Sequence, residues 1–367
     1  MKRRLCLSAS LSLPLWPWVA QAQAQARRRL QFPLDHGSHP DFAIEWWYIT
    51  GQLLAAQRQF GFQLTFFRSR VAATQGMRSR FAAKQLIFAH AAVTDVTSQK
   101  LLHDQRIARA SGTTQIDLAS ASDSDMALQL GDWSLQRDGK RYRAQAIGSD
   151  FSFQLNLTET QPLLLQGDQG WSRKGPQASQ ASFYYSLPQL QVSGQLSLGA
   201  ETLQVQGQAW LDHEWSQSLM NPQAVGWDWI GMNLADGSAL TAFRLRTKDG
   251  STLWAGGSLR AAGASNAEIF SESDVTFSPE RSWKSPISGA TYPVQWSVQI
   301  RRTQPNTGVP VLERYTVKAV IDNQELDSRQ STGAIYWEGL SELQDTAGKV
   351  VGRGYLEMTG YASPLQL

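Results

Sequence analysis

The most regular alternation of apolar and polar residues in the chain runs from residue 203 to residue 211. One set of alternate positions holds Leu203, Val205, Gly207, Ala209 and Leu211, and the other holds Gln204, Gln206, Gln208 and Trp210. A period of two predicts a β-strand with one buried face. If the strand continues, Asp212 and Glu214 share a face with Trp210, while His213 lies on the apolar face.

Short alternating runs of this kind recur along the chain between turns rich in Gly, Asn, Asp and Ser. They cover residues 44–49, 60–67, 86–93, 126–135, 151–157, 189–198, 239–245, 292–300 and 315–321. Short strands at this spacing predict an all-β protein built from antiparallel barrels or sandwiches. A length of 367 residues favours two domains. Asn221-Pro222 interrupts the pattern, so we expect domains at 27–217 and 218–367.

The first 26 residues have the order of a secretory signal peptide. Lys2, Arg3 and Arg4 precede an apolar stretch over 5–20, and small-x-small sequences follow up to Ala26. The pattern predicts cleavage near Ala26 or Arg27 and a secreted or periplasmic protein. An uncleaved anchor is the alternative, although two prolines break the apolar run. Arg3-Arg4 leaves a twin-arginine export route open.

Removing this segment changes the charge balance. The whole chain has 34 basic and 31 acidic residues, and loss of three basic residues leaves 31 of each. A formally neutral chain gives no reason to expect a nucleic-acid partner. The one cysteine, Cys6, lies in the signal, so no disulfide is expected in the mature chain. Sequences typical of serine hydrolases, nucleotide-binding loops and dinucleotide-binding folds are missing, and we expect no cofactor.

Asp212 and Glu214 are the candidate catalytic residues. Two positions along a strand separate them by about 6.6 Å. A carboxyl group beside an indole can have a raised pKa and donate a proton. The alternative places both side chains on a solvated face with the glutamines, or in pairs with arginines across a strand.

Tryptophans gather around this pair. Twelve remain after the signal, and Trp227 and Trp229 follow the carboxylates after a turn-rich link. We expect Trp210, Trp227 and Trp229 to line or border one ligand site near the domain junction, with adjacent antiparallel strands placing the indoles opposite the carboxylates.

Two other groups of polar residues have alternative interpretations. Asp35, His36, His39 and Asp41 lie in a loop without a second ligand cluster at fixed spacing, so we expect packing into the first strand and no metal site. Glu45 is a ligand-contact candidate beside Trp47, and it could instead form a buried ion pair with Arg68 or Lys174.

Long aromatic motifs give the sequence a family resemblance. The stretches that carry it are 32–37 (FPLDHG), 45–51 (EWWYITG), 60–68 (FGFQLTFFR), 166–168 (QGD), 174–175 (KG), 182–186 (SFYYS), 210–215 (WLDHEW), 226–229 (GWDW) and 352–361 (GRGYLEMTGY). Together they resemble the AttH-like family, which is labelled as predicted secreted hydrolases and is related to carotenoid 1,2-hydratase.

The resemblance implies two lipocalin-like β-barrel domains that hold a hydrophobic small molecule or lipid, in a secreted or periplasmic protein associated with ABC-transporter components. It adds Tyr185 to the ligand-contact candidates Trp47 and Glu45. It also implies an alternative, a hydratase or hydrolase acting on an isoprenoid- or carotenoid-like substrate. The hydratase's acid lies in a tyrosine-x-aspartate element, and the similar place here is Trp210-Leu211-Asp212, where the tyrosine is replaced. Whether the protein is an enzyme is left open.

Overall fold

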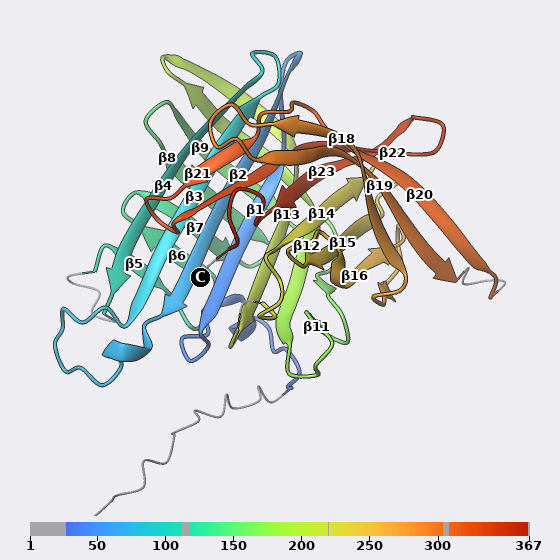
Figure 1. The fold of residues 1–367 in the computed structure, drawn as a ribbon. Coiled ribbons are helices and arrows are strands. Elements are labelled where there is room, and N and C mark those ends of the chain that lie inside the picture. Colours follow the sequence, from blue (N-terminus) through green and yellow to red (C-terminus); the bar gives the residue numbers. More distant parts are fainter. Residues whose placement is uncertain (1–26, 112–116, 219, 304–307, 366–367) are drawn as a thin grey trace, which may run out of the picture.

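The computed structural model describes residues 27–111, 117–218, 220–303 and 308–365, and the proposed signal lies outside them. Within these ranges the chain is almost all β-strand (Figure 1). Two short 3-10 helices, η1 (Leu34–His36) and η2 (Ala72–Thr74), complete the regular structure. No helix in this described part is long and apolar enough to cross a membrane.

The first sheet is antiparallel and has thirteen strands among the described residues. Its strands are β1 (Ile44–Ala55), β2 (Arg58–Arg70), β3 (Gln85–Asp95), β4 (Lys100–Ala110), β5 (Ala119–Ala121), β6 (Ala127–Leu130), β7 (Trp133–Asp138), β8 (Arg141–Ile147), β9 (Phe151–Thr158), β10 (Leu164–Leu165), β11 (Trp171–Arg173), β12 (Ala181–Leu198) and β13 (Glu201–Ser216). They follow the order β4-β3-β2-β1-β13-β12-β9-β8-β7-β6-β5, with β10 and β11 both beside β12. The two end strands β4 and β5 contact each other, so the sheet is a nearly closed barrel.

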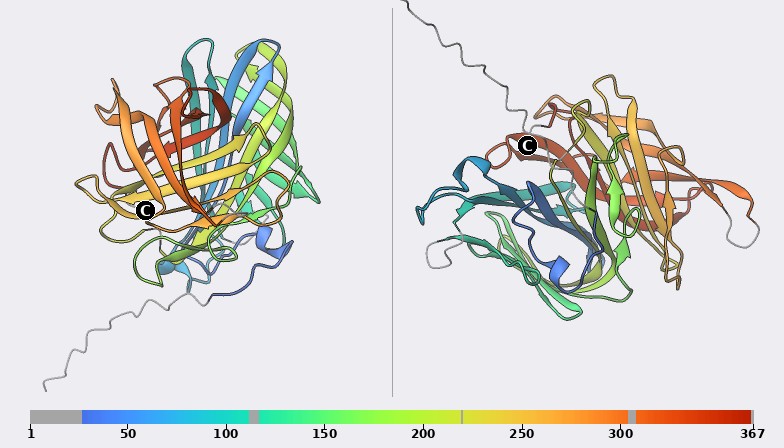
Figure 2. Two further views of the ribbon diagram at one scale, coloured as in Figure 1. Left: turned by 90° about the vertical axis from the view of Figure 1, so that its right-hand side faces the viewer. Right: turned by 90° about the horizontal axis from the view of Figure 1, so that it is seen from below.

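The second sheet has ten strands over the same described part of the chain. They are β14 (Gly226–Leu234), β15 (Ala239–Arg246), β16 (Thr252–Arg260), β17 (Glu268–Phe270), β18 (Val275–Lys284), β19 (Thr291–Thr303), β20 (Pro310–Ala319), β21 (Glu325–Ser328), β22 (Ala334–Gln344) and β23 (Val350–Met358). Their order is β17-β16-β15-β14-β23-β22-β20-β19-β18. Figure 2 shows the two sheets curling side by side, the first in blue to green and the second in yellow to red. The all-β prediction is confirmed.

Apolar side chains fill the interior of each curled sheet. The first interior is packed by alternate residues such as Trp47, Leu64 and Trp215, and the second by residues such as Ile230 and Trp337. A third cluster joins the sheets, with Tyr48 and Trp210 from the first and Trp229 and Phe243 from the second. Alternation along each strand therefore sends successive side chains to two different apolar environments.

Two details differ from the sequence-based expectations. Residues 126–135 form a hairpin, β6 and β7, because Gly131 turns the chain at a φ of 62°. β13 and β14 are not paired strands, since β13 lies between β1 and β12 while β14 lies between β15 and β23. The indoles of β14 thus face the carboxylates of β13 across the space between the two sheets. The predicted junction at 217/218 lies in the link from Ser216 to Gly226, and the division into two domains at this point stays a prediction.

Candidate functional site

A pocket lies between the two sheets. The space between its walls, open solvent at the mouth included, is about 1040 Å³, of which about 110 Å³ can be occupied by the centre of a water molecule. The first sheet and its loops contribute Ile44, Trp46, Tyr48, Thr65, Phe67, Phe88, His90, Lys174, Tyr184, Asp212 and Glu214. The second sheet and its loops contribute Trp227, Trp229, Phe243, Leu245, Thr332, Ala334, Tyr336, Glu338, Glu357 and Thr359. Met220, from the link between β13 and β14, and Leu365, which follows β23, also line the pocket. Aromatic walls and a few polar groups are typical of a small-molecule site.

The strand register explains how these side chains reach the pocket. On β1, Trp46 and Tyr48 point between the sheets, and Trp47 points into the first interior. On β13, Asp212 and Glu214 face the pocket, and His213 faces the same interior as Trp47. The shared face of Asp212 and Glu214 and the inward face of His213 are those that the period of two predicts.

Asp212 is a buried carboxyl group held by three neutral donors. The Tyr184 hydroxyl donates to Oδ2 at 2.6 Å, the Ser186 hydroxyl to Oδ1 at 2.5 Å, and the Trp210 indole N–H to Oδ1 at 2.6 Å. Burial raises the pKa of Asp212 to about 7, although these hydrogen bonds oppose the shift. A group with this pKa can exist as an acid or as a base near neutral pH.

Glu214 has a different environment, because it has a cationic partner. Lys174 Nζ lies 3.0 Å from its Oε1, and the Ser182 hydroxyl donates to the same oxygen. The ammonium group also lies over the rings of Tyr184 and Phe243, 4.6 Å and 4.3 Å from their centroids. The two carboxyl groups of β13 therefore differ: one is surrounded by neutral donors and the other is ion-paired.

Two further carboxyl groups lie on the opposite wall of the pocket. Glu338 on β22 and Glu357 on β23 are direct partners in the antiparallel register. Burial raises the pKa of Glu357 to about 8, helped by the nearby charges of Asp212 and Glu214. Burial also raises the pKa of Glu338 well above its usual range, as does the charge of Glu357. Like charges directly opposite on a sheet repel, so this pair favours a protonated form.

The structure brings together the predicted residues around the junction. Trp227 and Trp229 line the pocket with Asp212 and Glu214. Trp210 lies behind Asp212, buried and in edge contact with Trp229 at 6.4 Å between ring centroids. The Trp229 indole N–H donates to the Tyr184 hydroxyl at 3.1 Å, which in turn donates to Asp212.

Trp47, Glu45 and Tyr185 lie on the other side of the first sheet, away from this pocket. Glu45 is fully buried, and its Oε2 accepts from Arg68 Nε at 2.7 Å. Of the two ion-pair partners considered from sequence, Arg68 is the one that contacts it, while Lys174 pairs with Glu214. Tyr185 bridges two histidines, His36 at 2.7 Å and His213 at 3.2 Å.

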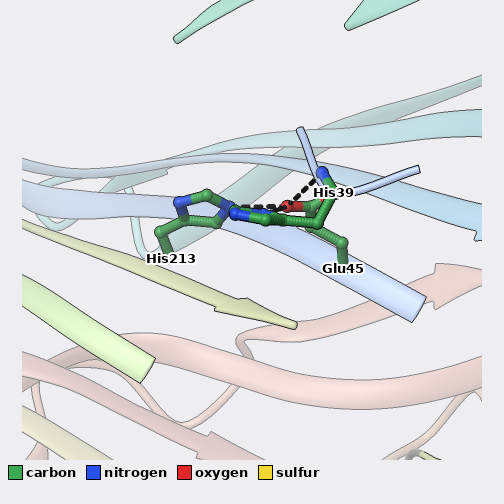
Figure 3. Close-up of side chains that lie close together, drawn as sticks. All are labelled: His39, Glu45 and His213. Atoms are coloured by element: carbon green, nitrogen blue, oxygen red, sulfur yellow. Dashed lines mark hydrogen bonds and ion pairs between the residues drawn. The ribbon is translucent and has the colours of Figure 1, made fainter. Parts of the chain in front are cut away.

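Figure 3 shows the group around Glu45, where one oxygen contacts two imidazole rings. Oε1 lies 2.6 Å from His39 Nδ1 and 2.9 Å from His213 Nε2. The three residues are near enough to share a metal ion. Their ligand atoms are, however, bonded to one another, and His39 Nε2 contacts Asp35 at 3.0 Å. A cation would compete with the Arg68 guanidinium and these N–H groups, so the cluster is described best as a hydrogen-bonded ionic network.

Sequence reasoning missed several lining residues. The sequence pattern singles out neither Glu338 nor Glu357 as a site residue. The signal for Glu338 is weak, one acid after Tyr336-Trp337 in an alternating run. Lys174 enters only as a possible partner of Glu45 and as part of a family motif, and Tyr184 only as part of a motif. Only the packing of the second sheet against the first places these groups in one pocket.

Comparisons with known proteins agree with this architecture. A model of the AttH-like family matches residues 23–361. The crystal structure of a protein assigned as an AttH from Nitrosomonas europaea is 44% identical, covers 92% of this chain and 99% of its own, and superposes with a TM-score of 0.81. Kievitone hydratase from Nectria haematococca is 14% identical over 91% of this chain and 94% of its own, with a TM-score of 0.68. The latter likeness shows a shared fold alone.

No curated protein matches the sequence. The family match covers both sheets and every lining residue of the pocket except Leu365, and the identity to the Nitrosomonas protein extends over nearly the full chain. These findings confirm the resemblance carried by the aromatic motifs, and the chain belongs to the AttH-like family.

Proposed function

We propose that the protein binds a hydrophobic small molecule or lipid in the pocket between the two sheets. The observation that carries this proposal is the pocket itself: aromatic side chains from both sheets form its walls, and most of its polar groups, among them four carboxyl groups, are buried. Apolar walls supply affinity through the hydrophobic effect, and convergent polar groups orient the ligand. The interiors of the two sheets are packed with their own side chains.

Binding of a polyene fatty acid, followed by its fluorescence, tests this proposal. Trp227→Ala removes a lining indole and should weaken binding by about 1–3 kcal/mol. Trp283→Ala is the matched control, because Trp283 packs beside the core of the second sheet and does not line the pocket. Equal weakening by both variants, or none by either, would place the ligand elsewhere.

A second candidate function is the hydration of an apolar alkene, with Asp212 as the acid. The raised pKa of Asp212 favours it, and so does the fold shared with a protein named as a hydratase. In such a reaction the Asp212 carboxyl would donate its proton to one alkene carbon. A water oxygen would bond to the other carbon, and the proton released from that water would return to a carboxylate of the pocket. The net change is the addition of one water molecule.

The two candidates make different predictions for Asp212→Asn. A protein that only binds should keep its ligand and show no turnover with either side chain. An enzyme should convert an isoprenoid alkene to a product heavier by one water molecule, and the variant should lose this conversion while it retains binding. Mass spectrometry of the extracted product separates these outcomes.

Export and a transport partner complete the proposal. The signal-like order of residues 1–26 supports secretion to the periplasm or outside, and the family resemblance supports association with ABC-transporter components. N-terminal sequencing of exported protein should give a start near Ala26 or Arg27. Cross-linking in the native envelope should capture the transporter components, and their consistent absence would count against that partner.

A further inference from the structure

The Glu338–Glu357 wall of the pocket has no cationic partner. Among the described lining residues there are four carboxyl groups, Asp212, Glu214, Glu338 and Glu357, and one ammonium group, that of Lys174. Lys174 is already paired with Glu214 on the other wall. Asp212 accepts hydrogen bonds from three neutral donors. Of the four carboxyl groups, the two on β22 and β23 therefore have the least compensation for a negative charge.

Glu338 also has unused hydrogen-bonding capacity. Its side chain is 2% exposed, and its Oε1 has no hydrogen-bond partner although it is buried. The Tyr48 hydroxyl lies near it across the two sheets, and its hydrogen-bonding interaction opposes the rise in the pKa of Glu338, but burial and the charge of Glu357 outweigh it. An unpaired buried polar atom is costly to a protein. Its position at a cavity indicates that a bound molecule supplies the missing partner.

The surroundings of this wall suit one kind of chemical group. Trp227 and Trp229 on β14 lie beside β23, where Trp229 is the direct partner of Glu357. Tyr48 approaches from the first sheet. Indole and phenol rings attract an ammonium group through their faces, and carboxyl groups supply the compensating charge. An alcohol or an amide would use the hydrogen-bonding capacity, but it would not neutralise two adjacent carboxylates.

We propose that the Glu338–Glu357 wall binds the positively charged head of an apolar ligand, either a protonated amine or a quaternary ammonium. The apolar body of this ligand lies against the aromatic residues of both sheets. The inference rests on the proposed function, because it assumes that the pocket takes a hydrophobic molecule, and it adds the chemical class of that molecule.

Binding of such a ligand is coupled to proton release. Without a ligand, burial keeps these carboxyl groups protonated to a higher pH than in water. A cation favours the ionised form, so its affinity should rise as pH increases through the pKa of about 8 of Glu357. The titratable groups that face the pocket or lie beside this wall are Tyr48, His90, Lys174, Tyr184, Asp212, Glu214, Tyr336, Tyr355, Glu338 and Glu357. Burial lowers the pKa of His90 to about 3 and raises those of the four tyrosines, so these five groups do not change charge between pH 6 and pH 9.

Probes of equal chain length and different head charge test the inference. Calorimetry compares dodecyltrimethylammonium, 1-dodecanol and dodecanoate, each below its micelle concentration, on the full mature chain. We expect the cation to bind at least about tenfold more tightly than the alcohol at pH 8.5. Its affinity should increase about tenfold from pH 6 to pH 9 with measurable proton release, while that of the alcohol changes less than about twofold.

Glu338→Gln and Glu357→Gln should each reduce the ratio of cation affinity to dodecanol affinity about tenfold. Glu342→Gln is the matched control, since Glu342 lies on the same strand β22 and pairs with Arg353 outside the pocket. If one glutamine variant does not fold, the other still tests the assignment to this wall.

The results separate the two proposals. Equal or tighter binding of dodecanol or dodecanoate at every pH would overturn the cation site and leave the hydrophobic pocket standing. A failure of all three probes to bind would overturn both. A cation preference that survives both glutamine substitutions would show that the charge is recognised elsewhere, and it would overturn the assignment to this wall.

Discussion

Two carboxyl groups of the first sheet show how much a residue's properties depend on the face it occupies. Glu45 and Asp212 are both buried, on the adjacent strands β1 and β13. Burial alone would raise the pKa of each. For Glu45 the hydrogen bonds from His213 and His39 outweigh burial, and the pKa falls well below its usual range. Asp212 has neutral donors, and its pKa rises to about 7. The first arrangement stabilises a fixed charge, and the second leaves a proton available.

At the same scale, Glu357→Gln should change the dependence of stability on pH. The folded pKa of about 8 exceeds the ordinary value of 4.5, so ionisation favours the unfolded chain. This destabilisation is missing below about pH 4.5, grows as pH rises, and is complete above about pH 8. The variant should match the parent protein at pH 4.5 and exceed its free energy of unfolding by roughly 1–3 kcal/mol at pH 8. Urea unfolding at both pH values measures the difference, and a gap of equal size at both would contradict this interpretation.

At the scale of elements, β12 connects the two sides of the site. This strand carries Tyr184 toward the pocket and Tyr185 toward the first interior, and its pairing with β13 shifts between Leu187 and Leu190. Pro188 lies in this irregularity, where a missing N–H is tolerated. Gln189 follows with a φ of 58°, and its backbone N–H donates to Asn233 in the second sheet at 2.8 Å. The irregularity therefore joins the sheets.

Gln189→Ala should destabilise the whole protein. The Gln189 amide donates to the backbone oxygens of Leu234 at 3.0 Å and Ser238 at 2.9 Å, and all three groups are buried. Each carbonyl oxygen keeps a backbone donor, Gly237 N–H for Leu234 and Leu234 N–H for Ser238, so the substitution removes two buried hydrogen bonds and costs about 1–3 kcal/mol. Gln191→Ala on the exposed part of the same strand should stay within about 0.5 kcal/mol of the parent protein. Equal thermal midpoints for the two variants would show that the bridge does not contribute.

The elements also show what a sequence can and cannot predict here. Alternation identified the strand that carries Asp212 and the faces of its neighbours, because burial on one side imposes a period of two. It did not predict the turn at Gly131, although the buried positions change phase there, from Leu128 and Leu130 to Trp133 and Leu135. It could not assign Glu338, because a strand face that covers a neighbouring sheet and one that meets solvent have the same local pattern. The carboxyl groups of the two walls lie far apart in the sequence, with 124 positions between Glu214 and Glu338.

At the scale of the whole molecule, the pocket exists only where the two sheets meet. Tyr48 and Trp210 belong to the first sheet, and they are covered by Trp229 and Phe243 of the second. His90 contacts the Tyr336 hydroxyl at 2.8 Å, which adds a polar contact between the sheets. The cover over one side of the first sheet therefore includes a buried apolar cluster shared by the two sheets. Such an interface favours joint folding rather than two independent units.

This reasoning predicts the behaviour of the two halves expressed separately, as residues 27–217 and 218–367. Each half would expose the apolar face that the other covers, and contiguous exposed apolar surface favours association. We expect the full mature chain to unfold in one cooperative transition. The fragment 27–217 should bind a hydrophobic dye strongly, melt at least about 10 °C lower, and aggregate. Mixing the two purified halves should restore dye exclusion if they reassociate through Trp210 and Trp229. A monomeric first half with the parent thermal midpoint would instead show that the first sheet folds independently and that the second contributes only the far wall of the pocket.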